Sequence, residues 1–342
     1  MKSTILNLFK SRYLILIAAI FIAGCQAEAV VEKAPPSAAS DASEILLEAT
    51  ATLTPLPTFT PTATETATPL PSATPIPSAT QTPTLEPGAT QISTRDGMVL
   101  HYVPAGEFLM GSTDQSLGSD YDEKPQHPVF LDAFWIDQTE VTNAMFAVFL
   151  NEMGNQVEGH AAWLDTIDED VLLAQIDGIW QPKKETSDFP AVEVTWYGAR
   201  AYCDWAGRRL PTEAEWEKAA RGTDARSYPW GEEQDCSKAQ VANCHSVLTD
   251  VGSKPSGMSP YGIFDMAGSV WEWVADWYAE DYYAISPANN PTGPEDGSAR
   301  ALRGGSYDYN WKHARTADRR LNGPANSMND YGFRCVQSAS IP

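Results

Sequence analysis

The chain has 342 residues and carries 23 Lys and Arg against 45 Asp and Glu, which gives a net charge of −22. A surface this acidic is repelled by phosphate backbones, so we expect no nucleic-acid partner. All 11 tryptophans lie at or beyond Trp135. Composition therefore predicts one folded domain, over residues 94–338, behind a leader with little core-forming material.

Residues 1–25 have the pattern of an export signal. Three basic residues precede an apolar run at 13–22, which is too short to span a bilayer comfortably. The run ends in Ala23-Gly24-Cys25 and resembles a bacterial lipoprotein signal, in which the cysteine is acylated and becomes the mature N-terminus. We therefore predict lipidation at Cys25, with the protein facing the periplasm or cell surface and touching membrane only through that anchor. The alternative is an ordinary cleaved signal in which Cys25 is incidental.

Residues 26–93 have the composition of a linker. Residues 50–90 alone contain 14 Thr and 9 Pro. Such a segment has too little apolar surface to offset the entropy of ordering, and proline keeps it extended. We expect a disordered Thr/Pro-rich tether without catalytic residues.

Three short helices are predicted beyond this linker. Thr142 can cap a helix over 143–153, and Thr195 can cap one over 196–206. Thr212 and Glu215 have capping-box spacing for a third helix, which ends near Arg221. Short apolar runs such as 99–103 and 130–136 are broken by turn residues. This pattern predicts a single irregular α+β domain with little regular secondary structure.

The cysteines indicate a disulfide framework. Without Cys25, an even four remain in an exported chain, which allows three pairings. Cys236 and Cys244 are close enough to close a local loop, which leaves Cys203 to pair with Cys335. A four-thiolate metal site is the alternative, but the spacing contains no CxxC knuckle.

Seven sequence blocks occur in a recognisable order. They are VPAGEFLMGS (103–112), LDAFWIDQTEVT (131–142), AYCDWAGRRLPTEAEW (201–216), YPWG (228–231), YGIFDMAGSVWEW (261–273), RGGSY (303–307) and YGFRC (331–335). In this order the blocks resemble the formylglycine-generating enzyme (sulfatase-modifying factor) family over about residues 95–338. The resemblance implies an irregular mixed fold related to C-type lectins. It also implies the pairing of Cys203 with Cys335.

The chemistry of that family is oxidation of a sulfatase cysteine to formylglycine, with O2 and copper(I) held by two thiolates. The two cysteines normally follow the RGGSY string, five residues apart, and here those positions are Tyr309 and Ala314. No cysteine lies between Cys244 and Cys335. A phenol and a methyl group cannot replace two thiolates on copper(I). We therefore expect neither copper binding nor the family's oxidase activity.

Five residues are candidates for a binding groove: Ser306, Tyr309, Trp311, His313 and Arg315. Ser306 matches a serine that lines the family's groove, but a turn hydroxyl is the alternative. Tyr309 and Trp311 could form an aromatic wall for a peptide or sugar, or could pack in the core. His313 could serve acid–base chemistry or lie on the surface. Arg315, like Arg319, could instead brace loops through carboxylates.

Calcium is the metal that the resemblance implies, bound structurally through oxygen ligands. The matching positions of a first site are Asp265, Gly268, Val270 and Glu272, and a second site would begin at Asn243. Ser269 replaces the usual asparagine. The alternative is that Asp265 and Glu272 brace loops without an ion.

Three functions follow from these observations. The first is a tethered envelope protein without oxidase activity, which binds a protein, peptide or glycan through the family groove. The second is an enzyme with an altered mechanism that uses Tyr309 and His313. The third is an ordinary formylglycine-generating oxidase, which needs a source of thiolates that the sequence lacks.

Overall fold

The helices begin and end close to where their capping residues predict. The protein is described from a computed structural model, over residues 85–244 and 246–339. Within them the α-helices are α1 (Asn143–Met153), α2 (Trp196–Trp205) and α3 (Glu213–Arg221). The hydroxyls of Thr142, Thr195 and Thr212 each accept a backbone N–H of the first turn, and Thr212 and Glu215 form the predicted capping box.

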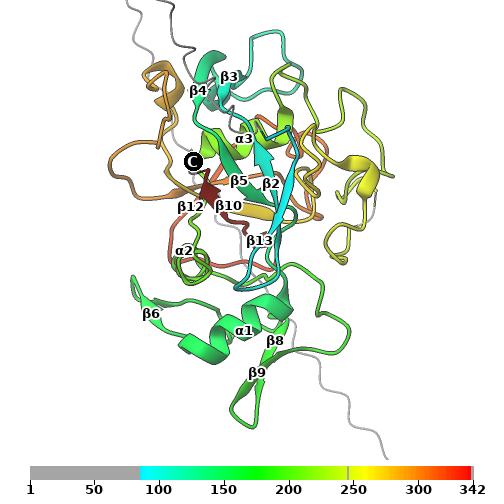
Figure 1. The fold of residues 1–342 in the computed structure, drawn as a ribbon, viewed down its shortest axis with the longest axis vertical. Coiled ribbons are helices and arrows are strands. Elements are labelled where there is room, and N and C mark those ends of the chain that lie inside the picture. Colours follow the sequence, from blue (N-terminus) through cyan, green and yellow to red (C-terminus); the bar gives the residue numbers. More distant parts are fainter. Residues whose placement is uncertain (1–84, 245, 340–342) are drawn as a thin grey trace, which may run out of the picture. The chain divides into compact units, whose positions relative to one another are not determined.

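The strands are short and fall into several small sheets (Figure 1). One four-stranded sheet has the order β1-β2-β5-β14, and a second has the order β12-β11-β10-β13. The pairs β3–β4, β6–β7 and β8–β9 form separate two-stranded sheets. The strand bounds are β1 (Thr90–Ile92), β2 (Val99–Val103), β3 (Gly106–Met110), β4 (His127–Leu131), β5 (Phe134–Asp137), β6 (Val157–Glu158), β7 (Ala161–Ala162), β8 (Leu173–Ile176), β9 (Ile179–Pro182), β10 (Trp271–Trp277), β11 (Arg300–Arg303), β12 (Arg320–Asn322), β13 (Tyr331–Gly332) and β14 (Val336–Ser338).

This composition confirms the predicted α+β class with little regular structure. Three single-turn 3-10 helices complete the described elements: η1 (Tyr121–Glu123), η2 (Pro255–Gly257) and η3 (Tyr282–Ala284). Long loops join the elements, most visibly between α3 and β10 (Figure 1).

Two details differ from the sequence-based expectations. Strand β1 lies inside the expected linker 26–93, so the folded domain begins before residue 94, because Thr90–Ile92 completes a ladder with β2. The apolar run 130–136 forms two strands, since the backbone N–H of Asp132 donates to Asn290 and leaves the ladder there. The predicted signal, Cys25 and the linker up to residue 84 lie outside the described residues.

Two apolar clusters form the core. One joins α1, α2, β10 and the chain around β13, and contains Phe146, Tyr202 and Trp273. The other lies between the β2–β5 strands and α3, with Trp216 fully buried. In Figure 1, α1 lies beside the β8–β9 hairpin. The side-chain amide of Asn151 in α1 donates to the Trp180 carbonyl of β9 and accepts the Trp180 backbone N–H.

Both predicted disulfides are present, Cys203–Cys335 and Cys236–Cys244. The first joins α2 to the segment before β14, across 132 residues. Disulfides of this kind are typical of exported proteins. Over the described ranges, no helix is long and apolar enough to cross a membrane.

Candidate functional site

The loop after β11 folds back on itself through two glycines. Gly304 and Gly305 have φ of 99° and 75°. A Cβ on Gly305 would lie 2.5 Å from the carbonyl oxygen of His313, so only glycine fits this close approach. Ser306 is fully buried, and its hydroxyl donates to Asp330 Oδ2 at 2.7 Å. The serine therefore stabilises the loop through a side-chain bond.

Tyr309 lies at the centre of an aromatic cluster at the surface. Its half-buried ring meets Trp271 edge-on, with centroids 5.7 Å apart, and meets His313 edge-on at 5.3 Å. The guanidinium carbon of Arg320 lies 4.7 Å from the Tyr309 ring centroid. We call Trp271, Tyr309, His313 and Arg320 the Tyr309 cluster. It occupies the position at which the family resemblance places the first copper ligand.

Trp311 and Ala314 point into a small third core. Trp311 is 7% exposed and packs against Tyr228 and Trp230, with ring centroids 5.5 and 6.3 Å away. Ala314 is buried in the same cluster. The Trp311 ring is thus held by core contacts, and the two expected wall residues, Tyr309 and Trp311, lie in different clusters.

His313 contacts a buried carboxylate. Its Nδ1 lies 3.3 Å from Asp318 Oδ2, and the imidazole is partly exposed. Burial raises the pKa of Asp318, while the contacts with His313 and Arg315 oppose that rise. This contact orients the imidazole, because the carboxylate fixes which way Nδ1 points.

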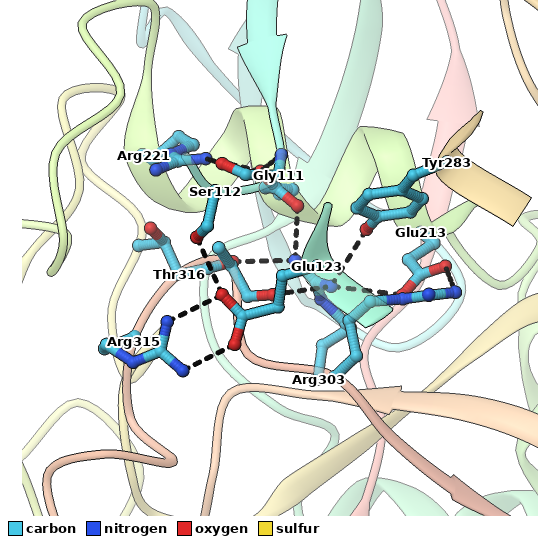
Figure 2. Close-up of polar contacts among 12 residues, drawn as sticks. Gly111, Ser112, Glu123, Glu213, Arg221, Tyr283, Arg303, Arg315 and Thr316 are labelled. Atoms are coloured by element: carbon cyan, nitrogen blue, oxygen red, sulfur yellow. Dashed lines mark hydrogen bonds and ion pairs between the residues drawn. The ribbon is translucent and has the colours of Figure 1, made fainter. Parts of the chain in front are cut away.

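Arg315 belongs to a network of buried ion pairs, drawn in Figure 2. Its two Nη atoms donate to the Glu123 carboxylate at 2.7 and 2.6 Å, and Ser112 donates to the same carboxylate at 2.7 Å. Burial alone raises the pKa of Glu123, but the Arg315 bonds hold it below its usual value. Arg315 therefore braces η1 through its last residue, Glu123.

The network continues to helix α3. Arg303 donates to Glu217 at 2.6 Å and to Glu213 at 3.1 Å, and Arg319 donates to Glu213 at 2.7 Å (Figure 2 labels Arg303 and Glu213). Glu217 also accepts from Arg221 at 2.6 Å. Arg303 and Arg319 thus form buried ion pairs with glutamates of α3. These ion pairs fix both ends of the loop that carries Tyr309.

The residues expected to bind calcium have protein partners. Glu272 accepts both Arg334 Nε and Nη2 at 2.7 Å, and also the indole N–H of Trp216 at 2.9 Å. Asp265 accepts the backbone N–H of Gly252. Asn243, assigned to the second site, accepts the backbone N–H of Trp311 at 3.2 Å. The backbones of Gly268 and Val270 lie between Asp265 and Glu272, in the turn that leads into β10.

A further carboxylate, Glu140, joins this region, and sequence reasoning did not predict it. Glu140 is fully buried, and its side-chain oxygens face Ser269 and Asp265 without a well-formed hydrogen bond among the described residues. Arg334 Nη2 is 3.8 Å away. Burial, followed by the neighbouring Asp265, raises the pKa of Glu140 well above its usual value. Carboxylate oxygens are the ligands that a hard cation prefers. Glu140 fits calcium better than Glu272 does, because the oxygens of Glu272 already accept bonds from Arg334 and Trp216.

A pocket of about 970 Å³ lies apart from all these residues. Its walls come from the end of β2, the β4–β5 turn, α2 and the residues around Arg209, and they include the ring of Trp196. None of the predicted groove or calcium residues lines it.

The comparisons with known proteins agree with the fold. A family model described as "Sulfatase-modifying factor enzyme 1-like domain" matches residues 84–339, so the chain belongs to the formylglycine-generating enzyme family. The protein named "Formylglycine-generating enzyme" from Streptomyces coelicolor is 38% identical over 301 residues, which cover 75% of this chain and 93% of that protein. The solved structure titled "Structure of PvdO from Pseudomonas aeruginosa" has a TM-score of 0.62 and 26% identity, and covers 75% of this chain and all of that one.

Two further relatives carry other names. The "Serine/threonine-protein kinase pkn1" of Chlamydia caviae is 40% identical over 240 residues, which are 69% of this chain but only 37% of that protein. The mouse protein named "Inactive C-alpha-formylglycine-generating enzyme 2" is 33% identical over 288 residues, covering 72% of this chain and 88% of that protein. Family membership is therefore compatible with more than one function.

Sequence reasoning did not identify three residues whose polar or charged groups lack a well-formed hydrogen bond or a salt bridge among the described residues: Glu140, Trp271 and Arg320. The motif strings contain Glu140 and Trp271, and Arg320 directly follows an arginine that was considered. Their sequence positions gave no sign of which polar atoms lack partners, because that depends on contacts between distant segments.

Proposed function

We propose that this protein makes no formylglycine and uses the family groove around Tyr309 to bind a peptide, protein or glycan in the cell envelope. One observation carries the proposal: Tyr309 and Ala314 stand where the resemblance places two copper-binding cysteines. The phenol packs against Trp271, and the Ala314 side chain is buried in a small core. Neither group offers copper(I) a soft ligand.

The remaining cysteines support the same conclusion. All four in the described part of the chain are joined in the two disulfides, so none offers a thiolate there. A relative named as inactive supports the idea that members of this fold can persist without the oxidase activity.

A direct test combines copper binding with turnover. The oxidised full chain is incubated under air with copper(I) and a peptide that contains a sulfatase cysteine motif, and mass spectrometry reads the peptide. We expect an unmodified peptide and no copper retained against a thiol-free chelator. A double variant, Tyr309→Cys with Ala314→Cys, is the matched control, and we expect it to retain copper. Conversion of the peptide by the unaltered chain would refute the proposal.

The envelope location is a separate part of the proposal. The signal at 1–25 and Cys25 support it, together with the disulfides of the folded domain. The chain is expressed in a bacterium fed with labelled fatty acid. We expect label in the unaltered chain and none in Cys25→Ser, while label in neither would contradict lipidation.

We further propose that calcium binds structurally beside Asp265, with Glu140 among its ligands. The support is the fully buried Glu140 carboxylate, whose oxygens make no well-formed hydrogen bond among the described residues and which lies near the Asp265 carboxylate. Calcium would offset the repulsion between the two carboxylates. Thermal unfolding tests this proposal: we expect Ca²⁺ to raise the Tm of the unaltered chain after chelation. In Glu140→Gln the increase should be lost, and an unchanged Tm on Ca²⁺ addition to the unaltered chain would exclude the site.

A further inference from the structure

Arg320 differs from almost every other described arginine in its charge environment. Within residues 85–244 and 246–339, only Arg300 and Arg320 lack a salt bridge to a carboxylate. Arg300 lies between the rings of Trp196 and Trp277, at 3.8 and 3.5 Å, and donates to a backbone carbonyl. Arg320 instead lies at the Tyr309 cluster. A guanidinium that is held in place without a salt-bridge partner is well suited to bind an anionic group of a ligand.

Contacts hold the Arg320 side chain in place through Nε and the plane of the guanidinium, whereas its two outer nitrogens, the Nη atoms, make no hydrogen bond among the described residues. Arg320 Nε donates to the Tyr331 hydroxyl at 3.1 Å, and Asn322 donates to the same hydroxyl at 3.0 Å. The guanidinium also lies over the rings of Tyr309 and Trp271. Its two Nη atoms have no hydrogen-bond partner among the described residues. Burial alone lowers the pKa of Arg320, but the Tyr331 bond and neighbouring groups raise it above its usual value, so the charge persists.

A second donor without a partner lies in the same cluster. Trp271 is fully buried, and its indole Nε1 has no hydrogen-bond partner in the part of the chain that the structure describes. The Arg320 guanidinium carbon is 5.4 Å from the centre of the Trp271 ring. The N–H is too deeply buried for a ligand to bond to it directly. A buried donor without a partner beside the guanidinium nevertheless shows that this region is short of protein acceptors, which favours an incoming anion at Arg320.

We infer that the Tyr309 cluster recognises a carboxylate of a bound peptide, through the Nη pair of Arg320. The inference rests on the proposed binding function and narrows its ligand to a peptide with an Asp or Glu side chain. A guanidinium and a carboxylate match in planar, two-bond geometry, which gives both strength and direction.

The rings favour a peptide over a glycan. A sugar needs an open aromatic face on which to stack, but the Tyr309 ring is covered by Arg320 and bordered by Trp271 and His313. The Trp311 ring is likewise held by Tyr228 and its neighbours. The Nη atoms of Arg320, which have no hydrogen-bond partner among the described residues, suit a compact carboxylate better.

The acidic surroundings limit the number of charges that the ligand can carry. Asp330 lies close enough to interact with Arg320 but forms its hydrogen bond with Ser306. Asp308 and the net charge of −22 add further repulsion. We therefore expect one recognised carboxylate in an otherwise neutral or basic peptide.

The experiment compares two fluorescent peptide pools with the full chain. Both are randomised at flanking positions, with a fixed central Glu in one pool and Gln in the other. Binding is read by fluorescence anisotropy. We expect the Glu pool to bind about tenfold more tightly, since a charge-assisted bidentate bond is worth more than a neutral one. Arg320→Gln should abolish the preference.

Arg300→Gln is the matched control, because Arg300 is the other described arginine without a salt bridge but lies between Trp196 and Trp277, away from the Tyr309 cluster. This variant should still bind the Glu pool more tightly than the Gln pool. Equal binding of the two pools, lost in Tyr309→Ala, would overturn carboxylate recognition and leave the groove function standing. Preference for Glu that survives in Arg320→Gln would also overturn it. Binding of glucuronate oligosaccharides without either pool would overturn the peptide assignment, and no binding by any probe would overturn both proposals. Circular dichroism of each variant checks that it is folded.

Discussion

Replacing Arg315 by Met should destabilise the domain far more than the same substitution at an exposed arginine. Arg315 supplies two charged bonds to Glu123, whose side chain is fully buried. After Arg315→Met, Glu123 keeps only the Ser112 hydroxyl and one backbone N–H, from Asp120. An uncompensated buried charge of this kind costs about 3–5 kcal/mol.

The matched control is Arg95→Met. The Arg95–Glu152 pair has both side chains 45% exposed, so solvent screens it, and we expect a loss of at most about 1 kcal/mol. The double variant Arg315→Met with Glu123→Gln should recover part of the loss, because it removes the orphaned charge. Urea unfolding followed by tryptophan fluorescence measures all three at pH 7.

The effect also has a defined pH dependence. The pKa of Glu123 is lowered in the folded state, mainly because the Arg315 bonds outweigh the effect of burial. The stability from this pair is therefore present above the unfolded pKa, about 4.3, and is lost as pH falls through the folded pKa. We expect the deficit of Arg315→Met to shrink at about pH 3. An equal deficit at both pH values would refute a charge origin, and a deficit as small as that of Arg95→Met would refute the burial argument.

Three other predictions concern the stability of the folded domain. Thr212→Ala removes the N-cap of α3 and should lower the free energy of unfolding by about 1 kcal/mol, measured by urea titration, with Thr212→Ser as the control. Gly305→Ala places a methyl group 2.5 Å from the His313 carbonyl and should lower the Tm, whereas an unchanged Tm would contradict the close approach. Burial, and then the charge of Asp168, raises the pKa of Glu193 to about 7, so its contribution to stability is present below about pH 4.3 and is lost as pH rises through 7. Glu193→Gln should therefore unfold at a higher urea concentration than the unaltered chain at pH 8 but not at pH 4.

Local features were predictable where chemistry acts over a few residues. Threonine caps and terminal glycines place α1 and α3 at the predicted residues, since a cap and its helix are neighbours in sequence. The disulfides followed from counting, because a close pair leaves only one other pairing. The break between β4 and β5 was not predictable, because it depends on Asn290, far along the chain.

The candidate site was only partly predictable, for the same reason. Tyr309 and His313 were identified from their place after RGGSY, and they do lie in contact. Glu140 is important because its oxygens make no well-formed hydrogen bond, and Arg320 because no carboxylate forms a salt bridge with it, among the described residues. A missing partner is a property of the assembled fold, and no spacing along the chain encodes it.

Residues 303–320 contain two groups of side chains that alternate in sequence but lie in different places: some form buried ion pairs and others form the surface cluster. Arg303, Arg315 and Arg319 face inward and tie the loop to buried carboxylates, whereas Tyr309 and Arg320 contact one another at the surface. A change at position 309 therefore alters none of the buried ion pairs. This separation supports the proposed binding function, because position 309 can change while the buried ion pairs keep the shape of the loop.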